Sequence, residues 1–136
     1  MCPGKNLTAG RDGKVYNRDI RIDVKSFADR GVKLIVCLLN DYELRTLGCN
    51  AANYEKACAD YGVELYKYPI IEMAPPEDIK AFHKEVVLKI DSALTQGKKV
   101  IAHCRGGVGR AGLLACCVCL YRFKENKVFK KPNDVI

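Results

Sequence analysis

Three short apolar segments, each following a glycine, constrain the fold of this chain more than any other feature. They are residues 32–39 after Gly31, residues 63–68 after Gly62, and residues 100–102 after Gly97 and two lysines. Nearly continuous apolar runs of this length are typical of parallel strands whose two faces are both covered. The sequence therefore predicts that these segments are buried parallel strands.

Helical patterns lie before, between and after these segments. They cover residues 19–30, 50–61, 76–96 and 108–126, and Gly62 and Gly97 are placed to cap the second and third. In the third pattern, apolar side chains from Ile79 to Leu94 recur every three or four residues, which predicts one stripe facing the sheet. The fourth pattern is apolar nearly all round as far as Leu120, which predicts a buried central helix.

Strands that alternate with helices predict an α/β fold, with a mostly parallel central sheet flanked by helices. The length of 136 residues fits one compact domain, and a hydrophobic fraction of 49% is sufficient for a packed core. We therefore expect a single domain over residues 1–136. No apolar run approaches the ~18 residues of a membrane span, and no signal segment opens the sequence. We expect a cytoplasmic chain, with the nucleus as the alternative.

Eight cysteines are spread irregularly along the chain. Without a signal segment, this pattern favours free thiols in a reducing compartment over a disulfide framework. Cys116, Cys117 and Cys119 lack a nearby histidine or second cysteine pair to complete a zinc site, so we expect buried thiols and no metal. The formal net charge of +7 favours acidic partners or substrates. No aromatic and basic stacking surface is evident, and we expect no nucleic-acid partner.

The segment that joins the third strand to the last helix carries the chemistry. It reads His103-Cys104-Arg105-Gly106-Gly107-Val108-Gly109-Arg110. Its glycines let successive backbone N–H groups point into one concavity suited to a tetrahedral oxyanion, and the helix N-terminus adds about half a positive charge. Arg110 can bind two phosphate oxygens with its planar guanidinium. We expect these groups to lower the pKa of the Cys104 thiol and make it a thiolate nucleophile.

Other glycine-rich phosphate loops do not fit this segment. The Walker type requires Gly-Lys followed by Ser or Thr, which is missing here. The dinucleotide fingerprint opens with a glycine, whereas this loop opens with Cys104. A cysteine and an arginine six residues apart around three glycines are much more specific than the glycines alone.

The segment from His103 to Arg110 resembles the H-C-x5-R signature of the cysteine-dependent protein phosphatases. The wider sequence from Arg18 to Phe123 is most similar to the small dual-specificity type, and within it to the group of cyclin-dependent-kinase-associated phosphatases. The likeness also rests on Val36-Cys37-Leu38-Leu39, Glu43-Leu44, Gly62-Val63, Pro69-Ile70 and Pro76. The resemblance implies metal-independent hydrolysis of phosphotyrosine and phosphoserine or phosphothreonine in proteins, through a phosphocysteine intermediate and without a cofactor.

The resemblance also implies a role for each residue of the loop. Cys104 would attack phosphorus, while His103 would orient the loop and help to tune the thiol. The residues that would hold the phosphoryl oxygens are Arg105, Gly106, Gly107, Val108, Gly109 and Arg110.

The same mechanism needs a general acid to protonate the leaving oxygen. The family places an aspartate in a mobile loop before the cysteine, and here Glu72 falls at that position, 32 residues before Cys104. A glutamate can transfer the proton with a different reach, so Asp78 and Asp41 are alternatives. Because acidic residues after Pro76 also suit the first turn of a helix, Asp78 has a structural explanation as well.

Two features depart from the family pattern, and a third residue has two explanations. Ala111 follows Arg110 where the family has Ser or Thr, so we expect slow breakdown of the phosphocysteine. The chain ends at Ile136, shortly after the last helix, whereas relatives continue, so the domain is either a minimal form or short at its C-terminus. Cys37, at the end of a neighbouring strand, is either a redox partner of Cys104 or a buried thiol.

Other functions are left open by the sequence. Relatives with similar loops act on phosphoinositides or RNA 5′-triphosphates, which the positive net charge would help to bind. A weakly active phosphate-binding or kinase-docking module is favoured by Ala111 and Glu72 and opposed by the intact Cys104 and Arg110. Rhodanese-like sulfur transfer fits less well, because His103 and Arg110 favour phosphate. We expect a phosphorylated protein as substrate and a protein kinase as a second candidate partner, with the oligomeric state open.

Overall fold

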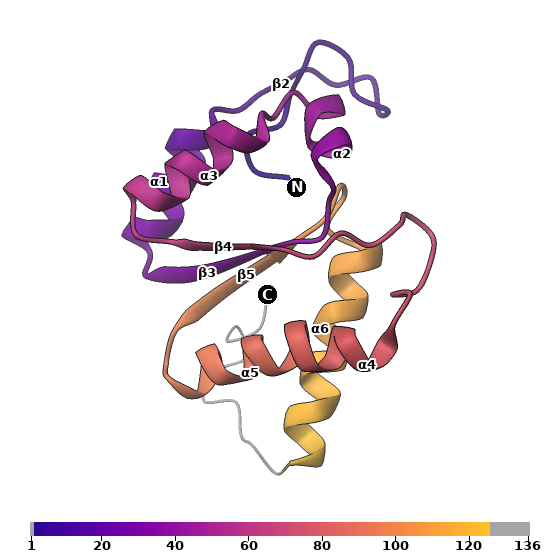
Figure 1. Ribbon diagram of the computed structural model, residues 1–136. Coiled ribbons are helices and arrows are strands. Elements are labelled where there is room, and N and C mark those ends of the chain that lie inside the picture. Colours follow the sequence, from indigo (N-terminus) through magenta and orange to yellow (C-terminus); the bar gives the residue numbers. More distant parts are fainter. Residues whose placement is uncertain (1, 126–136) are drawn as a thin grey trace.

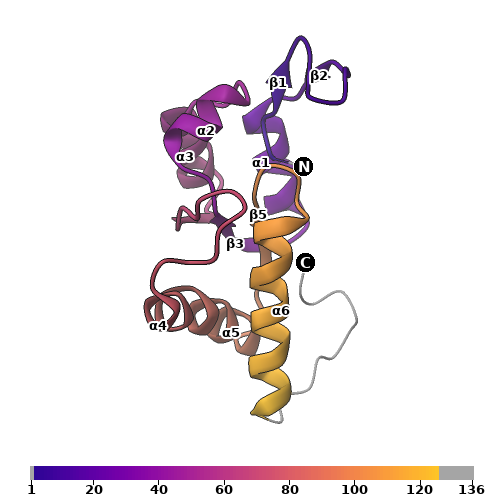
Figure 2. The ribbon, with the colours of Figure 1, turned by 90° about the vertical axis from the view of Figure 1, so that its right-hand side faces the viewer.

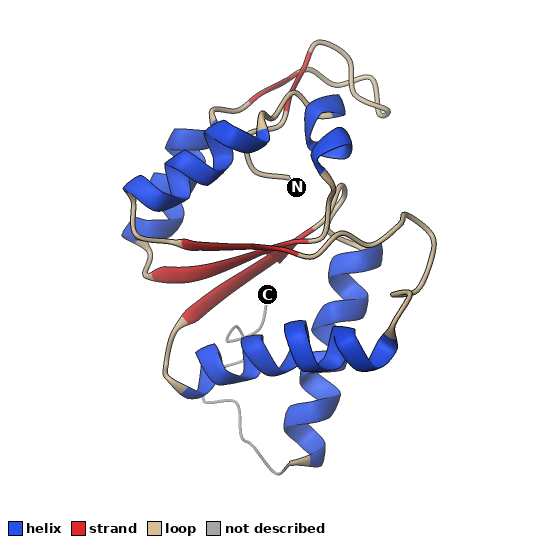
Figure 3. Cartoon of the chain, viewed as in Figure 1, coloured by secondary structure: helices blue, strands red, loops and turns tan. Residues whose placement is uncertain are grey.

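The computed structural model describes residues 2–125 of the chain. Its centre is a parallel sheet of three strands in the order β4-β3-β5, which Figures 1 and 3 show between two layers of helices. The strands are β3 (Val32–Cys37), β4 (Glu64–Lys67) and β5 (Lys99–His103). The predicted α/β class, with a parallel sheet flanked by helices, is confirmed. The expected C-terminal shortening at Ile136 lies outside the described residues.

The strand register brings the ends of the three strands together. Cys37 at the end of β3 lies opposite Lys67 of β4 and His103 of β5. Leu38, which the apolar run placed in the strand, is fully buried but lies beyond it. The chain turns there towards Asn40, whose side chain caps the next helix. The carboxyl ends of the strands therefore share one edge of the sheet, where open parallel sheets bind ligands.

Helices cover both faces of the sheet (Figures 1 and 2). One side holds α1 (Ile20–Asp29), α2 (Asp41–Thr46) and α3 (Ala51–Asp60), and the other holds α4 (Ile79–Phe82), the π-helix η1 (His83–Val87), α5 (Leu88–Thr95) and α6 (Gly109–Lys124). The predicted helices 19–30 and 50–61 are confirmed to within a residue at each end, because Asp19 and Asn50 cap their first turns. The short α2 was not predicted.

The long pattern of residues 76–96 folds differently from expectation. Its helix begins only at Ile79, because Asp78 accepts a hydrogen bond from the Ala81 N–H at 3.0 Å and caps the first turn. The wider turn of η1 then changes the helical repeat in the middle of the segment. Most of the predicted stripe is buried or partly buried, but Ile79 is 70% exposed and His83, which also belongs to the stripe, is exposed. The expected stripe is therefore wrong at these two residues.

The prediction of a fully buried last helix is also wrong. One face of α6 packs against β5, η1 and α5 and buries Leu114 and Val118. The other face is open among the described residues (Figure 2), and it exposes Cys116, Cys119, Leu120 and Phe123. Apolar residues on every face of a helix do not ensure that other helices or strands pack against every face. Neither α6 nor another helix within residues 2–125 has both the length and the apolarity needed to cross a membrane.

Two short strands near the N-terminus form a hairpin that the sequence pattern did not reveal. β1 (Asn6–Leu7) and β2 (Tyr16–Asn17) pair antiparallel. The backbone N–H of Asn6 donates to the Leu47 carbonyl at 2.9 Å, which ties the hairpin to the end of α2. Gly48 permits this approach, because its φ is +75° and an added Cβ would lie 1.9 Å from the Asn6 oxygen. The hairpin is thus fixed against the body of the molecule.

Candidate active site

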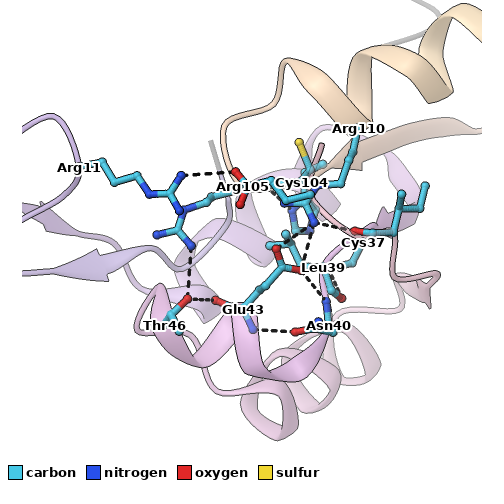
Figure 4. A network of polar contacts seen from close by, with 12 residues as sticks. Arg11, Cys37, Leu39, Asn40, Glu43, Thr46, Cys104, Arg105 and Arg110 are labelled. Atoms are coloured by element: carbon cyan, nitrogen blue, oxygen red, sulfur yellow. Dashed lines mark hydrogen bonds and ion pairs between the residues drawn. The ribbon is translucent and has the colours of Figure 1, made fainter. Parts of the chain in front are cut away.

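The loop between β5 and α6 forms the candidate active site (Figure 4). We call residues 103–110 the cysteine loop. β5 ends just before Cys104, and Arg110 lies in the first turn of α6. Gly107 has a φ of +79°, a left-handed conformation that glycine adopts without strain. The predicted strand, glycine-rich loop and helix N-terminus therefore follow one another at the carboxyl edge of the sheet.

Cys104 is buried, and its neighbours favour the thiolate form. Burial raises the pKa of the thiol, but the backbone N–H groups of Ala111 and Gly107, the Arg110 guanidinium and the Gly106 N–H together lower it by more. The net result is a pKa below the ordinary value of 9.0. The N-terminus of α6 adds positive potential in the same place. Cys104 is thus equipped to act as a nucleophile.

The Arg110 side chain is buried and held from two sides. Its Nη1 donates to the carboxylate oxygens of Glu43 at 2.9 and 3.1 Å and to the Ile70 carbonyl at 2.8 Å (Figure 4). Its Nη2 is buried and has no hydrogen-bond partner within residues 2–125. Burying a charged donor without an acceptor is costly, and a bound anion would remove that cost. One edge of the guanidinium is therefore available to a ligand.

His103 lies directly before the nucleophile and is fixed by Tyr54 of α3. The Tyr54 hydroxyl is 2.8 Å from Nε2, and Nδ1 is 3.4 Å from the Cys104 carbonyl oxygen. Because a carbonyl oxygen only accepts, Nδ1 carries the proton and Nε2 accepts from the hydroxyl. Burial lowers the pKa of His103 to about 4, so the ring is neutral at neutral pH. The His103 ring thus contacts the backbone carbonyl of Cys104 and adds no charge to the site.

Glu72 borders a cleft that it shares with the cysteine loop. The cleft has a volume of about 390 Å³, and its lining includes Glu72, Arg105 and Gly106 together with residues of the N-terminal hairpin. Glu72 lies in a turn in which Met73 has a φ of +64°, a conformation uncommon for a residue with a side chain. Its Oε1 is 3.4 Å from Arg11 Nη1. The structure therefore brings Glu72 to the edge of the loop that holds Cys104.

The two alternative acids have other partners. Asp78 caps α4 through its hydrogen bond from the Ala81 N–H. Asp41 begins α2 and pairs with Lys67 at 3.2 Å. Neither aspartate is among the described residues that line the cleft beside the cysteine loop. Glu72 is the one of the three predicted acids that borders it.

The remaining predicted phosphate-binding residues, Arg105 to Gly109, lie within the cysteine loop itself. Arg105 is half-buried, and its Nη1 is 3.4 Å from the neutral Thr46 hydroxyl. Residues 106–109 are exposed, and Val108 is 81% exposed. The N–H groups of Gly106 and Gly107 already interact with the Cys104 sulfur. The loop therefore directs backbone donors towards the Cys104 sulfur, while the Val108 side chain is exposed.

Cys37 lies at the end of β3, next to the strand that leads to Cys104. It is fully buried, and its sulfur is 3.8 Å from the Leu39 carbonyl oxygen. Burial raises the pKa of the Cys37 thiol to about 12. At neutral pH it is therefore a thiol, the form that attacks an oxidised cysteine poorly. Its role as a redox partner stays a prediction.

Sequence reasoning did not assign three contributions to this site. They are the carboxylate of Glu43, the hydroxyl of Tyr54 and the side chains of the N-terminal hairpin. Glu43 had a local signal, because it follows Asn40 at the spacing of a capping box just after a buried strand. Tyr54 and the hairpin had none, since their contacts join segments far apart in the sequence.

In this site a parallel strand leads into a glycine-rich loop, the loop cysteine has a lowered pKa, and a buried arginine lies in the following helical turn. This combination is typical of the cysteine-based phosphatases of the tyrosine and dual-specificity type. The chain belongs to the family described as "Polymorphic toxin system, DSP-PTPase phosphatase", whose model matches residues 9–122. The resemblance seen in the sequence is thereby confirmed, because the matched family is one of phosphatases.

Two curated relatives agree with this family. Cyclin-dependent kinase inhibitor 3 of Rattus norvegicus is 25% identical over 108 residues, which cover 79% of this chain and 49% of the rat protein. A candidate tyrosine phosphatase of Invertebrate iridescent virus 6 is 36% identical over 87 residues, or 62% of this chain and 30% of the viral protein. The chain thus spans about half the length of the first relative and less than a third of the second.

Two solved structures share the fold. A crystal structure of kinase-associated phosphatase, with its catalytic cysteine replaced by serine, matches with a TM-score of 0.74 and 24% identity over 88% of this chain and 62% of that one. The active form of Tk-PTP matches with a TM-score of 0.56 and 24% identity over 98% of this chain and 92% of that one. At this identity the likeness concerns the fold alone.

Proposed function

We propose that this chain hydrolyses phosphate esters of tyrosine and of serine or threonine in proteins, through a phosphocysteine on Cys104 and without a metal. The observation that carries the proposal is the pairing of two groups. The thiol of Cys104 has a lowered pKa, and Nη2 of the buried Arg110 lacks a partner within residues 2–125. A phosphoryl group in the loop would accept from Nη2 while its phosphorus faces the sulfur.

The proposed reaction has two displacement steps. In the first, the Cys104 thiolate forms a bond to phosphorus, the ester P–O bond breaks, and the leaving oxygen takes a proton from the Glu72 carboxyl. In the second, water attacks phosphorus and gives a proton to the Glu72 carboxylate, while the S–P bond breaks. Inorganic phosphate leaves and the thiolate is restored. Arg110 and the loop amides hold the oxygens in both steps.

Hydrolysis of a small aryl phosphate in the presence of EDTA tests the proposal. Turnover that EDTA leaves unchanged, and that vanadate inhibits, supports it. No turnover, with phosphate or vanadate still bound, would instead identify a phosphate-binding module. The rat relative is named as an inhibitor of a cyclin-dependent kinase. That name supports a protein kinase as one candidate partner, to be tested for binding in a second round of assays.

Replacing Glu72 by glutamine is expected to lower kcat for a phosphoserine peptide by about 10²-fold, because an alkoxide leaving group needs the proton. An aryl phosphate, whose leaving group is better, should be affected less. The measurement is kcat of the natural protein and of Glu72→Gln with both substrates.

Asp78→Asn and Asp41→Asn provide the matched controls, since each removes one carboxylate that does not line the cleft. Asp78→Asn keeps an acceptor for the Ala81 N–H, so it should change neither the thermal stability nor kcat by much. If either control, and not Glu72→Gln, lowered kcat for the phosphoserine peptide by about 10²-fold, that aspartate would be the acid and the assignment to Glu72 would be wrong.

Introducing a hydroxyl at position 111 is expected to speed the second step. Ala111 follows Arg110, and its N–H points at the Cys104 sulfur, so a serine there can donate to the departing thiolate. A hydrogen bond to a charged group contributes about 1.5–3 kcal/mol, or roughly ten- to hundredfold in rate. Rapid-quench kinetics should show a burst in the natural protein and a faster steady state in Ala111→Ser.

Ala111→Gly is the control, because it changes the side chain without adding a donor. It should keep the burst and the slow steady state. Absence of a burst in the natural protein, together with an unchanged rate in Ala111→Ser, would contradict a slow second step.

A further inference from the structure

The cleft between the N-terminal hairpin and the cysteine loop has no role in the reaction beyond the contact with Glu72. We propose that it binds a second anionic group of the substrate, so that the chain prefers phosphopeptides with a carboxylate or a second phosphate beside the phosphorylated residue. This inference rests on the proposed phosphatase function and names the substrate class of the same site.

The position of the cleft makes it a neighbour of the scissile phosphate. Its volume of about 390 Å³ is within the usual range for a binding pocket, ~300–1,000 Å³. Arg105 and Gly106 of the cysteine loop form one wall, and residues of the hairpin segment form another: Lys5, Leu7, Arg11, Asp12 and Tyr16. A peptide whose phosphate lies in the loop would place an adjacent side chain in this cleft.

The charges in the cleft favour an anion. Within residues 2–125, neither Lys5 nor Arg105 forms an ion pair: the Lys5 ammonium lies 3.8 Å from the centre of the Tyr16 ring, and Arg105 contacts the neutral Thr46 hydroxyl. Asp12, by contrast, already accepts hydrogen bonds from the Tyr16 hydroxyl at 2.5 Å and from a backbone N–H. The cleft therefore has cations without carboxylate partners.

The third cation, Arg11, is only loosely engaged. Its Nη1 is 3.4 Å from Glu72, and the two side chains are 70% and 45% exposed. Exposed ion pairs of this kind contribute little and exchange readily, so a substrate anion can compete for Arg11. Figure 4 shows the Arg11 and Arg105 side chains approaching from the hairpin and from the cysteine loop. Because Arg11 also contacts the proposed acid, Lys5 is the cleaner position to test.

The hairpin wall is held in place by backbone hydrogen bonds. The Arg18 N–H donates to the Lys5 carbonyl at 3.0 Å, and the Asn6 N–H donates to Leu47. Arg18 in turn binds the buried Asp23 through two hydrogen bonds, at 2.9 and 2.6 Å. Lys5 is thus presented from a fixed backbone, which lowers the entropy lost when an anion binds.

Three phosphopeptides of otherwise identical sequence test the proposal, with alanine, glutamate or phosphoserine beside a phosphotyrosine. We expect kcat/KM of the natural protein to be about five- to tenfold higher for the two acidic peptides than for the alanine peptide, since each exposed charge pair adds up to about fivefold. The preference should shrink in 0.5 M NaCl. The glutamate and phosphoserine peptides distinguish a carboxylate from a phosphate as the second anion.

Lys5→Ala should reduce this preference to about twofold. Lys25→Ala is the matched control, because it removes the same charge from α1, where Lys25 pairs with Asp29. A preference near one in the natural protein, or an equal loss in Lys25→Ala, would overturn the proposal. Thermal unfolding of both variants shows whether they are folded, and the salt dependence tests the natural protein without any substitution.

Binding of the same peptides to Cys104→Ser separates this inference from the function on which it rests. Turnover of an aryl phosphate without any preference for acidic peptides would support the phosphatase function and contradict the anion subsite. If the natural protein hydrolysed nothing, but Cys104→Ser bound the acidic peptides more tightly than the alanine peptide, the subsite would be supported and the phosphatase function would be wrong.

Discussion

Cys104→Ser is expected to abolish turnover of aryl phosphates, with a loss of at least about 10⁴-fold in kcat. The physical reason is the environment of the sulfur. The amides and the arginine that lower the pKa of a thiol below 9.0 cannot ionise a serine hydroxyl, which is a far weaker acid. Steady-state kinetics with EDTA present measure the loss, and thermal unfolding checks that the variant is folded.

The lowered pKa of Cys104 gives this prediction a pH dependence with a definite sign. Because the folded thiol has a pKa below the ordinary 9.0, the rate of Cys104 alkylation by iodoacetamide should rise with pH through the folded value and reach half of its maximum below pH 9. Cys58, whose pKa burial raises to about 11, is the internal comparison. Retention of turnover in Cys104→Ser, or alkylation that begins only above pH 9, would contradict the assignment.

Arg110→Lys is expected to lower kcat/KM by about 10²- to 10³-fold. A lysine keeps the positive charge beside Glu43, so the carboxylate is not left without a counter-charge. It cannot hold Glu43 and Ile70 with one nitrogen and offer a second to the phosphoryl group, as Nη1 and Nη2 of Arg110 are placed to do. Vanadate affinity, measured by competition, should fall in parallel.

Arg122→Lys is the matched control for Arg110→Lys. Arg122 is a second buried arginine of α6, and it pairs with Asp91 at 2.8 Å, away from the cysteine loop. This substitution should lower the thermal stability and leave kcat/KM within about twofold. Equal kinetic losses in the two variants would show that the effect is structural, and would remove Arg110 from the proposed phosphate site.

The arrangement of the cysteine loop could be predicted because its determinants are contiguous in the sequence. The strand end, the glycines, the nucleophile and the arginine all lie between His103 and Arg110, and the backbone donors come from the same segment. Local physical rules are sufficient for such a site. The three parallel strands were predictable for a similar reason, since each is a short apolar run that follows a glycine.

The supports of the loop could not be predicted from local rules. Glu43 holds Arg110 from 67 residues away, and Tyr54 holds His103 from 49 residues away. Each contact depends on the strand order β4-β3-β5, which brings α2 and α3 to the edge where β5 ends. The basic cleft depends on a hairpin with two residues in each strand, too short for an alternating pattern to be read.

The sequence was also insufficient to predict which helix faces are buried. The apolar character of α6 predicted burial, but burial also needs neighbours, and among the described residues only one face of α6 has them. In the preceding helices, the π turn of η1 changes the repeat on which the stripe prediction relied. Both differences lie away from the cysteine loop, and they leave the expectations for Cys104 and Arg110 unchanged.

Trapping the phosphocysteine during turnover is a direct test of the proposed reaction. The natural protein is mixed with an aryl phosphate in EDTA, quenched with acid within milliseconds and digested, and the phosphorylated peptide is identified by mass spectrometry. We expect a phosphoryl group on the sulfur of Cys104, present during turnover and missing in Cys104→Ser. Turnover without any phosphorylated cysteine, or with the phosphoryl group on His103, would contradict it.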